Sequence, residues 1–196
     1  MKTLALFASG KGSNADNICS YFKNHSSIHV GLICSDRKEA GVFEVAEKHQ
    51  VKSIYLSKSL IQNPSQIVDL MKEHNIDYII LAGYLKLIPK ELTEAFKGCI
   101  INIHPALLPS FGGKGMFGMH VHEAVAAAGV SETGITIHHV NEHYDEGAVI
   151  FQARTSLDKS DTPQTIAKKI AALEMENFPR VIEELLEGNK GYELFY

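Results

Sequence analysis

The feature that most constrains this chain is the alternation of short apolar runs with amphipathic stretches. The runs Leu4–Ala8, Asp77–Ala82 and Cys99–Ile103 are apolar almost throughout, which is typical of strands covered on both faces of a parallel sheet. Stretches with apolar residues at helical spacing lie between such runs, as in Ser65–His74. The alternation predicts an α/β fold: a doubly wound, mostly parallel sheet with helices on both faces.

The carboxyl-terminal part has a different pattern. Gly134–Val140 and Gly147–Ala153 alternate enough to predict a pair of late strands, partly antiparallel, around a connecting loop. Thr162 is expected to cap a final helix that has Pro163 at its first position, and Pro179 to bend or break that helix. The 196 residues contain no repeat or linker, so one domain over residues 1–196 is expected.

Composition excludes several classes of protein. Lys and Arg number 19 against 23 Asp and Glu, a net charge of −4, so the basic surface that a nucleic-acid partner needs is missing. Three dispersed cysteines predict neither a disulfide framework nor a zinc site. No run is long enough for a membrane span, and Leu4–Ala8 is too short for a signal peptide. We therefore expect a soluble, cytoplasmic protein without a membrane partner.

A glycine-containing loop follows the first predicted strand. Its sequence, Ser9–Asn14, reads Ser-Gly-Lys-Gly-Ser-Asn. Backbone N–H groups and a helix dipole at such a junction favour an anion such as a phosphate. The same residues, read through Ala15 with Asp36 after the second strand, also match a dinucleotide-binding pattern. Both interpretations stay open on the residues alone.

A second polar group lies where a buried strand ends. Asn102 and His104 are two residues apart, so strand alternation directs both side chains to the same side. An amide donor beside an imidazole can hold a developing oxyanion and exchange a proton with it. The segment from His104 to Met119 is rich in Gly and Pro, and predicts a long functional loop. A core amide and a solvated histidine are the alternative interpretation.

Histidines could also suggest a metal. His120 and His122 have strand spacing, but they fall at a predicted helix start, and His138, His139 and His143 follow no zinc pattern. We therefore predict no metal.

Together these segments resemble the phosphoribosylglycinamide formyltransferases, along most of the chain. Four segments of the family occur in order: Ser9–Asn14, Leu81–Ile88, Asn102–Pro109, and Gly134–Val140 leading to Asp145. The resemblance implies transfer of the formyl group of 10-formyltetrahydrofolate, a cosubstrate, to the amine of glycinamide ribonucleotide in purine biosynthesis. Direct transfer through a tetrahedral intermediate needs no metal. Both partners are small molecules, and the protein is expected to be a monomer or homodimer.

The resemblance also assigns roles to residues. Asn102, His104 and Asp145 would be catalytic, with Asp145 favouring the charged imidazole of His104. Glu174 would contact the glycinamide. The ribose phosphate would be bound by Lys11, Gly12, Ser13 and Asn14. The folate would be bound by Leu85, Lys86, Leu87, Ile88, Asn141, Glu142, His143 and Tyr144.

The chain departs from the family pattern at three places. Lys86 stands where Arg is common, which keeps the positive charge but loses the bidentate fork. Ala171 stands where Gln is frequent, and the loop 110–119 is longer and richer in glycine.

Other functions remain as alternatives. A formyltetrahydrofolate hydrolase would use water as the acceptor, and methionyl-tRNA formyltransferases share the catalytic logic but need an RNA-binding domain. A nicotinamide-dependent oxidoreductase would use Gly10, Gly12, Ala15 and Asp36. A non-catalytic module would bind folate or phosphate without turnover.

Overall fold

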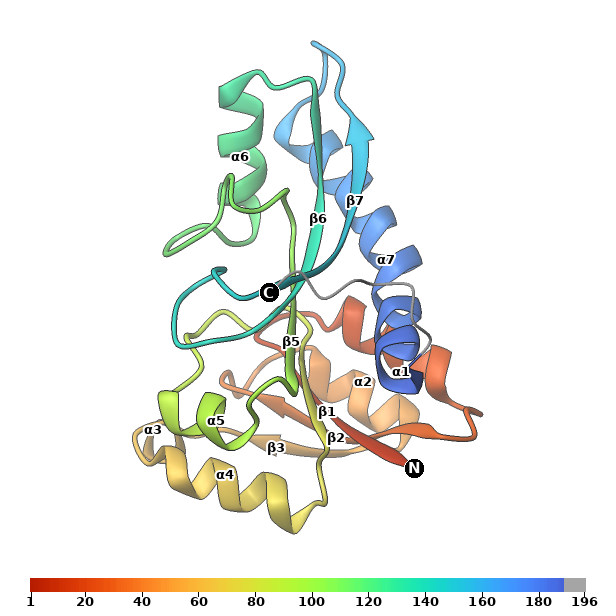
Figure 1. Ribbon diagram of the computed structural model, residues 1–196, viewed down its shortest axis with the longest axis vertical. Coiled ribbons are helices and arrows are strands. Elements are labelled where there is room, and N and C mark those ends of the chain that lie inside the picture. The colour runs from red at the N-terminus through yellow and green to blue at the C-terminus, as the bar shows by residue number, and fades with distance from the viewer. Residues whose placement is uncertain (189–196) are drawn as a thin grey trace. The chain divides into compact units, whose positions relative to one another are not determined.

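The computed structural model describes residues 1–188 (Figure 1). The chain forms two compact units, Met1–Asn102 and Ile103–Tyr196. The expectation of a single domain over residues 1–196 stays a prediction.

The first unit is built on a parallel sheet. Its strands are β1 (Lys2–Phe7), β2 (Ile28–Ser35), β3 (Lys52–Tyr55), β4 (Tyr78–Leu81) and β5 (Ile100–His104), which continues into the second unit. They lie in the order β3-β2-β1-β4-β5, and every pairing among them is parallel. Leu4, Leu6, Ile33, Ile79 and Ile80 are fully buried, as the continuous apolar runs predict.

Helices connect these strands. They are α1 (Ser13–Phe22), α2 (Val42–His49), α3 (Lys58–Ile61), α4 (Pro64–Glu73) and α5 (Lys90–Ala95). Helix α1 packs against α2, and α4 packs against α5. The strand order runs from β1 towards β3 and then turns back through β4 to β5. Because such crossovers are right-handed, the two helix pairs fall on opposite faces, and the order reverses between β1 and β4. The expected doubly wound fold is confirmed.

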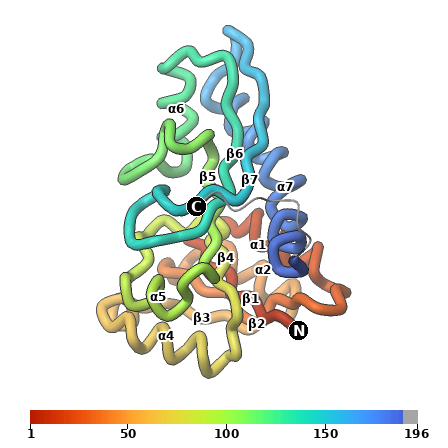
Figure 2. Tube along the Cα trace, in the orientation of Figure 1, coloured from red at the N-terminus to blue at the C-terminus, as the bar shows by residue number. Residues whose placement is uncertain are grey.

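The second unit contains the late strands. Strands β6 (Glu132–His139) and β7 (Val149–Ser156) are antiparallel, as predicted. Helices α6 (Met119–Ala128) and α7 (Pro163–Glu187) pack against each other, and α7 also packs on both strands. The segment between β5 and α6 is a long irregular loop, the green trace of Figure 2. The predicted loop is therefore confirmed.

Of the two outcomes expected at Pro179, a bend or a break of the final helix, the break is wrong. Helix α7 continues through Pro179 instead of breaking there. A proline removes a single backbone hydrogen bond, while Phe178, Val181 and Ile182 on either side of it are fully buried. Their burial holds the helix together across the lost bond. The amino-terminal end is as predicted, since the Thr162 side chain accepts a hydrogen bond from the Thr165 N–H in a capping box.

No helix within residues 1–188 has the length and apolar character needed to cross a membrane.

Candidate active site

The second unit gathers a buried group of polar side chains around Asp145. Nδ1 of His104 lies 3.5 Å from Oδ2 of Asp145, and Nε2 of His138 lies 3.7 Å from Oδ1. The backbone N–H of Gly113 donates to Oδ2 at 2.9 Å. The Asp145 side chain is only 11% exposed. The Asp145 carboxylate therefore contacts the end of one strand, a second strand and the long loop.

Local structure explains how these groups meet. His104 ends β5 and His138 lies near the end of β6. Asp145 has a φ of 57°, a left-handed conformation that Asp tolerates better than most residues. The loop that leaves β5 is fixed to β6 by Thr136, whose hydroxyl donates to the Ala106 carbonyl at 2.7 Å and accepts from the Leu108 N–H at 2.9 Å.

Both ring nitrogens of His104 have partners in this arrangement. Nε2 lies 2.8 Å from the carbonyl oxygen of Phe111. A carbonyl oxygen only accepts, so Nε2 carries the hydrogen and Nδ1 faces the Asp145 carboxylate. The Nδ1 of His138 is likewise a donor, to the His139 carbonyl at 2.8 Å. These contacts fix the orientation of both rings.

Burial and charge oppose each other at His104. Burial lowers the pKa of the imidazole below its ordinary value, and the nearby His138 adds to this, while the Asp145 charge and the Phe111 carbonyl raise it. Asp145 thus acts in the predicted direction, but burial is the larger effect. For Asp145 itself, burial would raise the pKa, yet His138, His104 and the Gly113 N–H together hold it below the usual range. The carboxylate is therefore charged at neutral pH.

Asn102 lies on the same strand as His104. It occupies the position two residues earlier in β5 and is half-buried. Strand alternation directs the two side chains to one side of the strand. An amide and an imidazole on one side, with a charged carboxylate beside the imidazole, can stabilise an oxyanion and exchange a proton with it.

The predicted phosphate loop lies in the first unit, between β1 and α1. Gly12 has a φ of 82°, and a Cβ there would lie 2.9 Å from Cα of Val42. Only glycine fits this backbone conformation and this close approach of α2. Lys11 and Ser13 are exposed, whereas Asn14 is buried. In general, the first backbone N–H groups of a helix have no partner within the helix, which is the arrangement that an anion site requires.

The predicted folate segment Leu85–Ile88 is also in the first unit. Leu85 is half-buried, Lys86 is exposed and Leu87 is 44% exposed, but Ile88 is 3% exposed and belongs to the core. Ile88 is thus less available to a ligand than its neighbours.

The other predicted binding residues lie in the second unit. Glu142 and His143 are exposed and Asn141 and Tyr144 are half-buried, in the loop before Asp145. Glu174 lies half-buried on α7.

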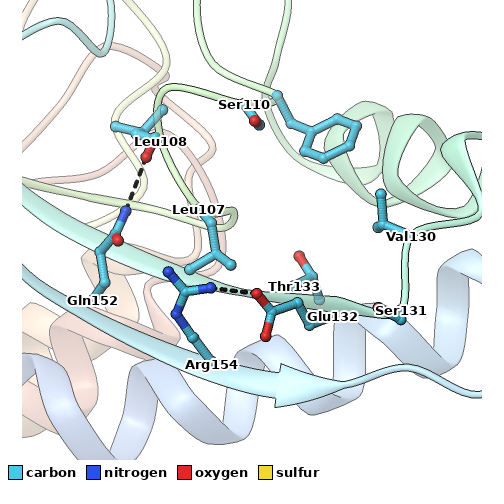
Figure 3. Close-up of a pocket in the computed structure, with 10 residues that line it drawn as sticks. Leu107, Leu108, Ser110, Val130, Ser131, Glu132, Thr133, Gln152 and Arg154 are labelled. Atoms are coloured by element: carbon cyan, nitrogen blue, oxygen red, sulfur yellow. Dashed lines mark hydrogen bonds and ion pairs between the residues drawn. The ribbon is translucent and has the colours of Figure 1, made fainter.

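A pocket of about 490 Å³ lies elsewhere in the second unit (Figure 3). Leu107, Leu108 and Ser110 line it from the loop, and Gln152 and Arg154 from β7. Gln152 donates to the Leu108 carbonyl at 3.0 Å, and Arg154 pairs with Glu132. The predicted catalytic residues do not line this pocket. Phe111 does line it, so its side chain borders the pocket while its carbonyl holds His104.

Two alternative interpretations lose their structural basis. His120 and His122 lie on α6, the first 67% exposed in its side chain and the second buried, because residues two apart on a helix do not share a face. They therefore do not form a metal-binding pair. The Asp36 side chain is 5% exposed and accepts a hydrogen bond from the Ser9 hydroxyl, so it is not presented to a ribose as a dinucleotide site requires.

Sequence reasoning missed three groups around Asp145 and His104. His138 was considered only as a metal ligand, although its place on a strand beside the Asp145 loop could have suggested a partner. The Phe111 carbonyl and the Gly113 N–H are backbone groups, which no residue type reveals.

Comparison with known proteins agrees with this fold. Residues 2–182 match the family model described as formyl transferase. The chain is 37% identical over 194 residues to phosphoribosylglycinamide formyltransferase of Bacillus subtilis, covering 96% of this chain and 97% of that protein. It is 39% identical over 192 residues to the chloroplastic phosphoribosylglycinamide formyltransferase of Arabidopsis thaliana, covering 95% of this chain and 66% of that protein.

Solved structures give the same picture. Phosphoribosylglycinamide formyltransferase from Streptococcus pneumoniae superposes with a TM-score of 0.84 at 35% identity, covering 95% of this chain and 99% of that one. Glycinamide ribonucleotide transformylase 1 from Geobacillus kaustophilus gives 0.87 at 37% identity, covering 95% and 99%.

The fold is a doubly wound sheet that this chain shares with solved formyltransferase structures. The chain belongs to the formyl transferase family, so the resemblance seen in the sequence is confirmed. It spans 66% and 61% of the length of the chloroplastic relatives from Arabidopsis thaliana and Vigna unguiculata.

Proposed function

We propose that the protein transfers the formyl group of 10-formyltetrahydrofolate to the amine of glycinamide ribonucleotide. The observation that carries the proposal is the buried His104–Asp145 pair, 3.5 Å apart, whose histidine lies on the strand that also carries Asn102. Family membership and the names of the relatives supply the two substrates.

The reaction is a direct transfer. The amine nitrogen attacks the formyl carbon, and the carbonyl electrons move onto oxygen to give a tetrahedral oxyanion. The Asn102 amide and an N–H of His104 stabilise that oxyanion. The bond from the carbon to N10 of the folate then breaks, the amine loses a proton, and N10 gains one. Tetrahydrofolate and formylglycinamide ribonucleotide leave. No covalent formyl-enzyme is needed.

The contacts of His104 indicate how it acts. Its Nε2–H donates to the Phe111 carbonyl at 2.8 Å, so an oxyanion would replace this carbonyl as acceptor. The charged Asp145 beside Nδ1 then stabilises a second proton on the ring as negative charge develops on the substrate. Burial keeps that proton from being held too tightly, which suits a group that must both take and return it.

The remaining predicted residues bind the substrates. Lys11, Gly12, Ser13 and Asn14 hold the phosphate at the start of α1, and Glu174 contacts the glycinamide. Leu85, Lys86, Leu87 and Ile88 bind the folate, together with the loop residues Asn141, Glu142, His143 and Tyr144. Both substrates are small molecules, and no metal takes part.

The test is the absorbance change when 10-formyl-5,8-dideazafolate, a stable donor, loses its formyl group. We expect turnover with glycinamide ribonucleotide and none without it. Equal turnover without the ribonucleotide would make the protein a hydrolase. A folded protein that binds the donor but never turns it over would be a binding module, and the proposal would be rejected.

A further inference from the structure

Three residues singled out in the sequence have no role in the chemical steps proposed above, although Lys86 belongs to the proposed folate segment. Ser9 opens the phosphate loop, Asp36 matched a ribose-binding acid, and Lys86 replaces an arginine. The structure brings all three together in the first unit, at the carboxyl ends of β1, β2 and β4. Ser9 is 1% exposed and the Asp36 side chain 5% exposed, so neither contacts a ligand directly.

Ser9 joins two segments that are far apart in the chain. Its N–H donates to the Gly83 carbonyl at 3.0 Å. Its hydroxyl oxygen accepts from the Leu85 N–H, also at 3.0 Å. Two hydrogen bonds therefore hold the turn after β4 to the residue that opens the phosphate loop.

Asp36 fixes the orientation of the Ser9 hydroxyl. The Ser9 hydroxyl donates to Oδ1 of Asp36 at 2.6 Å. A hydroxyl has one hydrogen, so donation to Asp36 directs a lone pair of the same oxygen to Leu85. The other carboxylate oxygen, Oδ2, lies 3.7 Å from Nζ of Lys86. One buried carboxylate thus orients Ser9 and attracts the neighbouring lysine.

The segment held in this way is the proposed folate segment. Tyr84 packs edge-on against Phe7 of β1, with ring centroids 5.4 Å apart, which adds an apolar contact to the same turn. Leu85 and Lys86 follow directly. The proposed phosphate-binding residues begin two positions after Ser9, at Lys11. The proposed phosphate-binding residues therefore follow Ser9 in the chain, and the proposed folate segment is hydrogen-bonded to the same serine.

We propose that Ser9 and Asp36 are positioning residues that fix the folate segment through the Leu85 N–H. The inference rests on the proposed function. It predicts that a side chain at the start of the phosphate loop governs affinity for the folate, without touching it, and that Lys86 is directed by Asp36.

The first experiment compares Ser9→Ala with Thr93→Ala by calorimetry. Thr93 is a buried hydroxyl of the same unit that donates to the Lys90 carbonyl at 2.9 Å within its own helix. We expect Ser9→Ala to weaken binding of 10-formyl-5,8-dideazafolate about tenfold, because the half-buried Leu85 N–H loses its acceptor, and Thr93→Ala to leave this affinity unchanged. Equal affinity in Ser9→Ala and the unmodified protein would overturn the inference.

A second readout needs no ligand. We expect the Leu85 amide to exchange its hydrogen at least tenfold faster in Ser9→Ala, and at the original rate in Thr93→Ala. Unchanged exchange would also overturn the inference. If the unmodified protein bound neither the donor nor glycinamide ribonucleotide, the proposed function would fail, and the exchange rate of Leu85 would still decide whether Ser9 positions this segment.

Two substitutions of Asp36 separate positioning from loss of folding, and serve if Ser9→Ala does not fold. Asp36→Asn keeps an oxygen that accepts from Ser9, so its folate affinity should stay within about threefold of the original. Asp36→Ala removes the acceptor and should match the tenfold loss and the faster Leu85 exchange. Equal effects of the two substitutions would contradict the orienting role.

Discussion

At His104, burial and the neighbouring groups together set the pKa of the imidazole. Burial lowers the pKa of the ring, whereas the Asp145 charge and the Phe111 carbonyl raise it. A charged imidazole in this position exists only to the extent that its partners offset desolvation. Removing a partner therefore changes the proton affinity of the ring as well as a contact.

We expect His104→Ala to lower kcat by about 10²- to 10⁴-fold, the usual contribution of a positioned acid or base. Folding and binding of the folate analogue should persist. Steady-state kinetics and calorimetry on the same preparation measure both. His120→Ala is the matched control, because His120 is 67% exposed on α6. Turnover of His104→Ala equal to that of the control would remove His104 from the catalytic role.

Asp145→Asn should move the pH profile in a definite direction. The charge of Asp145 raises the pKa of His104, so the substitution lowers it further. If protonated His104 is the active form, the alkaline limb of kcat/KM moves to lower pH. Kinetics across the neutral range measure the shift. Glu123→Gln, which removes an exposed carboxylate 3.5 Å from His120, should leave the profile in place, and an unshifted Asp145→Asn profile would show that Asp145 does not tune His104.

The site was only partly predictable from residues. Spacing alone placed Asn102 and His104 on one side of a strand, because strand geometry depends only on local order. Asp145 came from family resemblance, since no local rule brings residues 41 positions apart together. His138 was missed as its partner. The bond of His104 to the Phe111 carbonyl depends on a loop conformation that side-chain identity does not determine.

At the scale of elements, the turn between β6 and β7 requires a glycine at position 147. A Cβ at Gly147 would overlap the His139 carbonyl, and the His139 N–H donates to the Ala148 carbonyl at 2.9 Å. Gly147 thus allows the strands to close while Asp145 faces inward from the loop between them. A larger residue must separate the two strand ends.

Gly147→Ala should therefore lower stability and activity together. Overpacking of this kind costs about 1–3 kcal/mol, which for a chain of this size lowers the Tm by roughly 5 °C. Calorimetric melting and kcat measure the two effects. Gly129→Ala, where a Cβ meets nothing within 4 Å but a φ of 60° strains an alanine, should cost about 1 kcal/mol and leave kcat unchanged. A Gly147→Ala protein with normal kcat would mean that the turn does not position Asp145.

Element prediction failed where segments were short. The helices Lys58–Ile61 and Lys90–Ala95 were not predicted, because fewer than two turns give no recognisable period. Long apolar strands and the capped final helix were predicted well. The expected break at Pro179 did not occur, because the free-energy cost of one proline in the helix is smaller than the packing energy of the buried helix face around it.

For the whole molecule, buried histidines connect stability to pH. Burial lowers the pKa of His104, His122 and His139 below the ordinary value. Between the folded and unfolded pKa values the unfolded chain binds more protons, so the free energy of unfolding falls as pH drops below about 6.5. Asp145, whose pKa is lowered, adds a further loss at more acidic pH.

We expect urea denaturation to show this fall in stability between pH 7.5 and 5.5. His122→Gln should flatten the pH dependence of the free energy of unfolding. Glutamine does not titrate, so the substitution removes one group that binds a proton more readily in the unfolded chain. Thr93→Ala removes a buried hydroxyl and no titratable group, so it should keep the original slope. A slope unchanged by His122→Gln would show that this residue does not contribute.

The fold class of the whole chain followed from the sequence, since alternating strands and helices allow few topologies. The division after Asn102 did not. It falls inside a strand, where neither composition nor a linker gives a signal.

Because β5 crosses the division after Asn102, the position of a cut matters when the protein is split into two fragments. Asn102 and His104 are separated by one residue of β5, so the covalent chain sets the distance between their Cα atoms at about 6.6 Å. Two fragments cut after Asn102 would have to recover that spacing by noncovalent reassembly. A cut in the loop between Gly112 and Gly118 leaves both residues on one polypeptide, and there a split enzyme has the better prospect of regaining turnover.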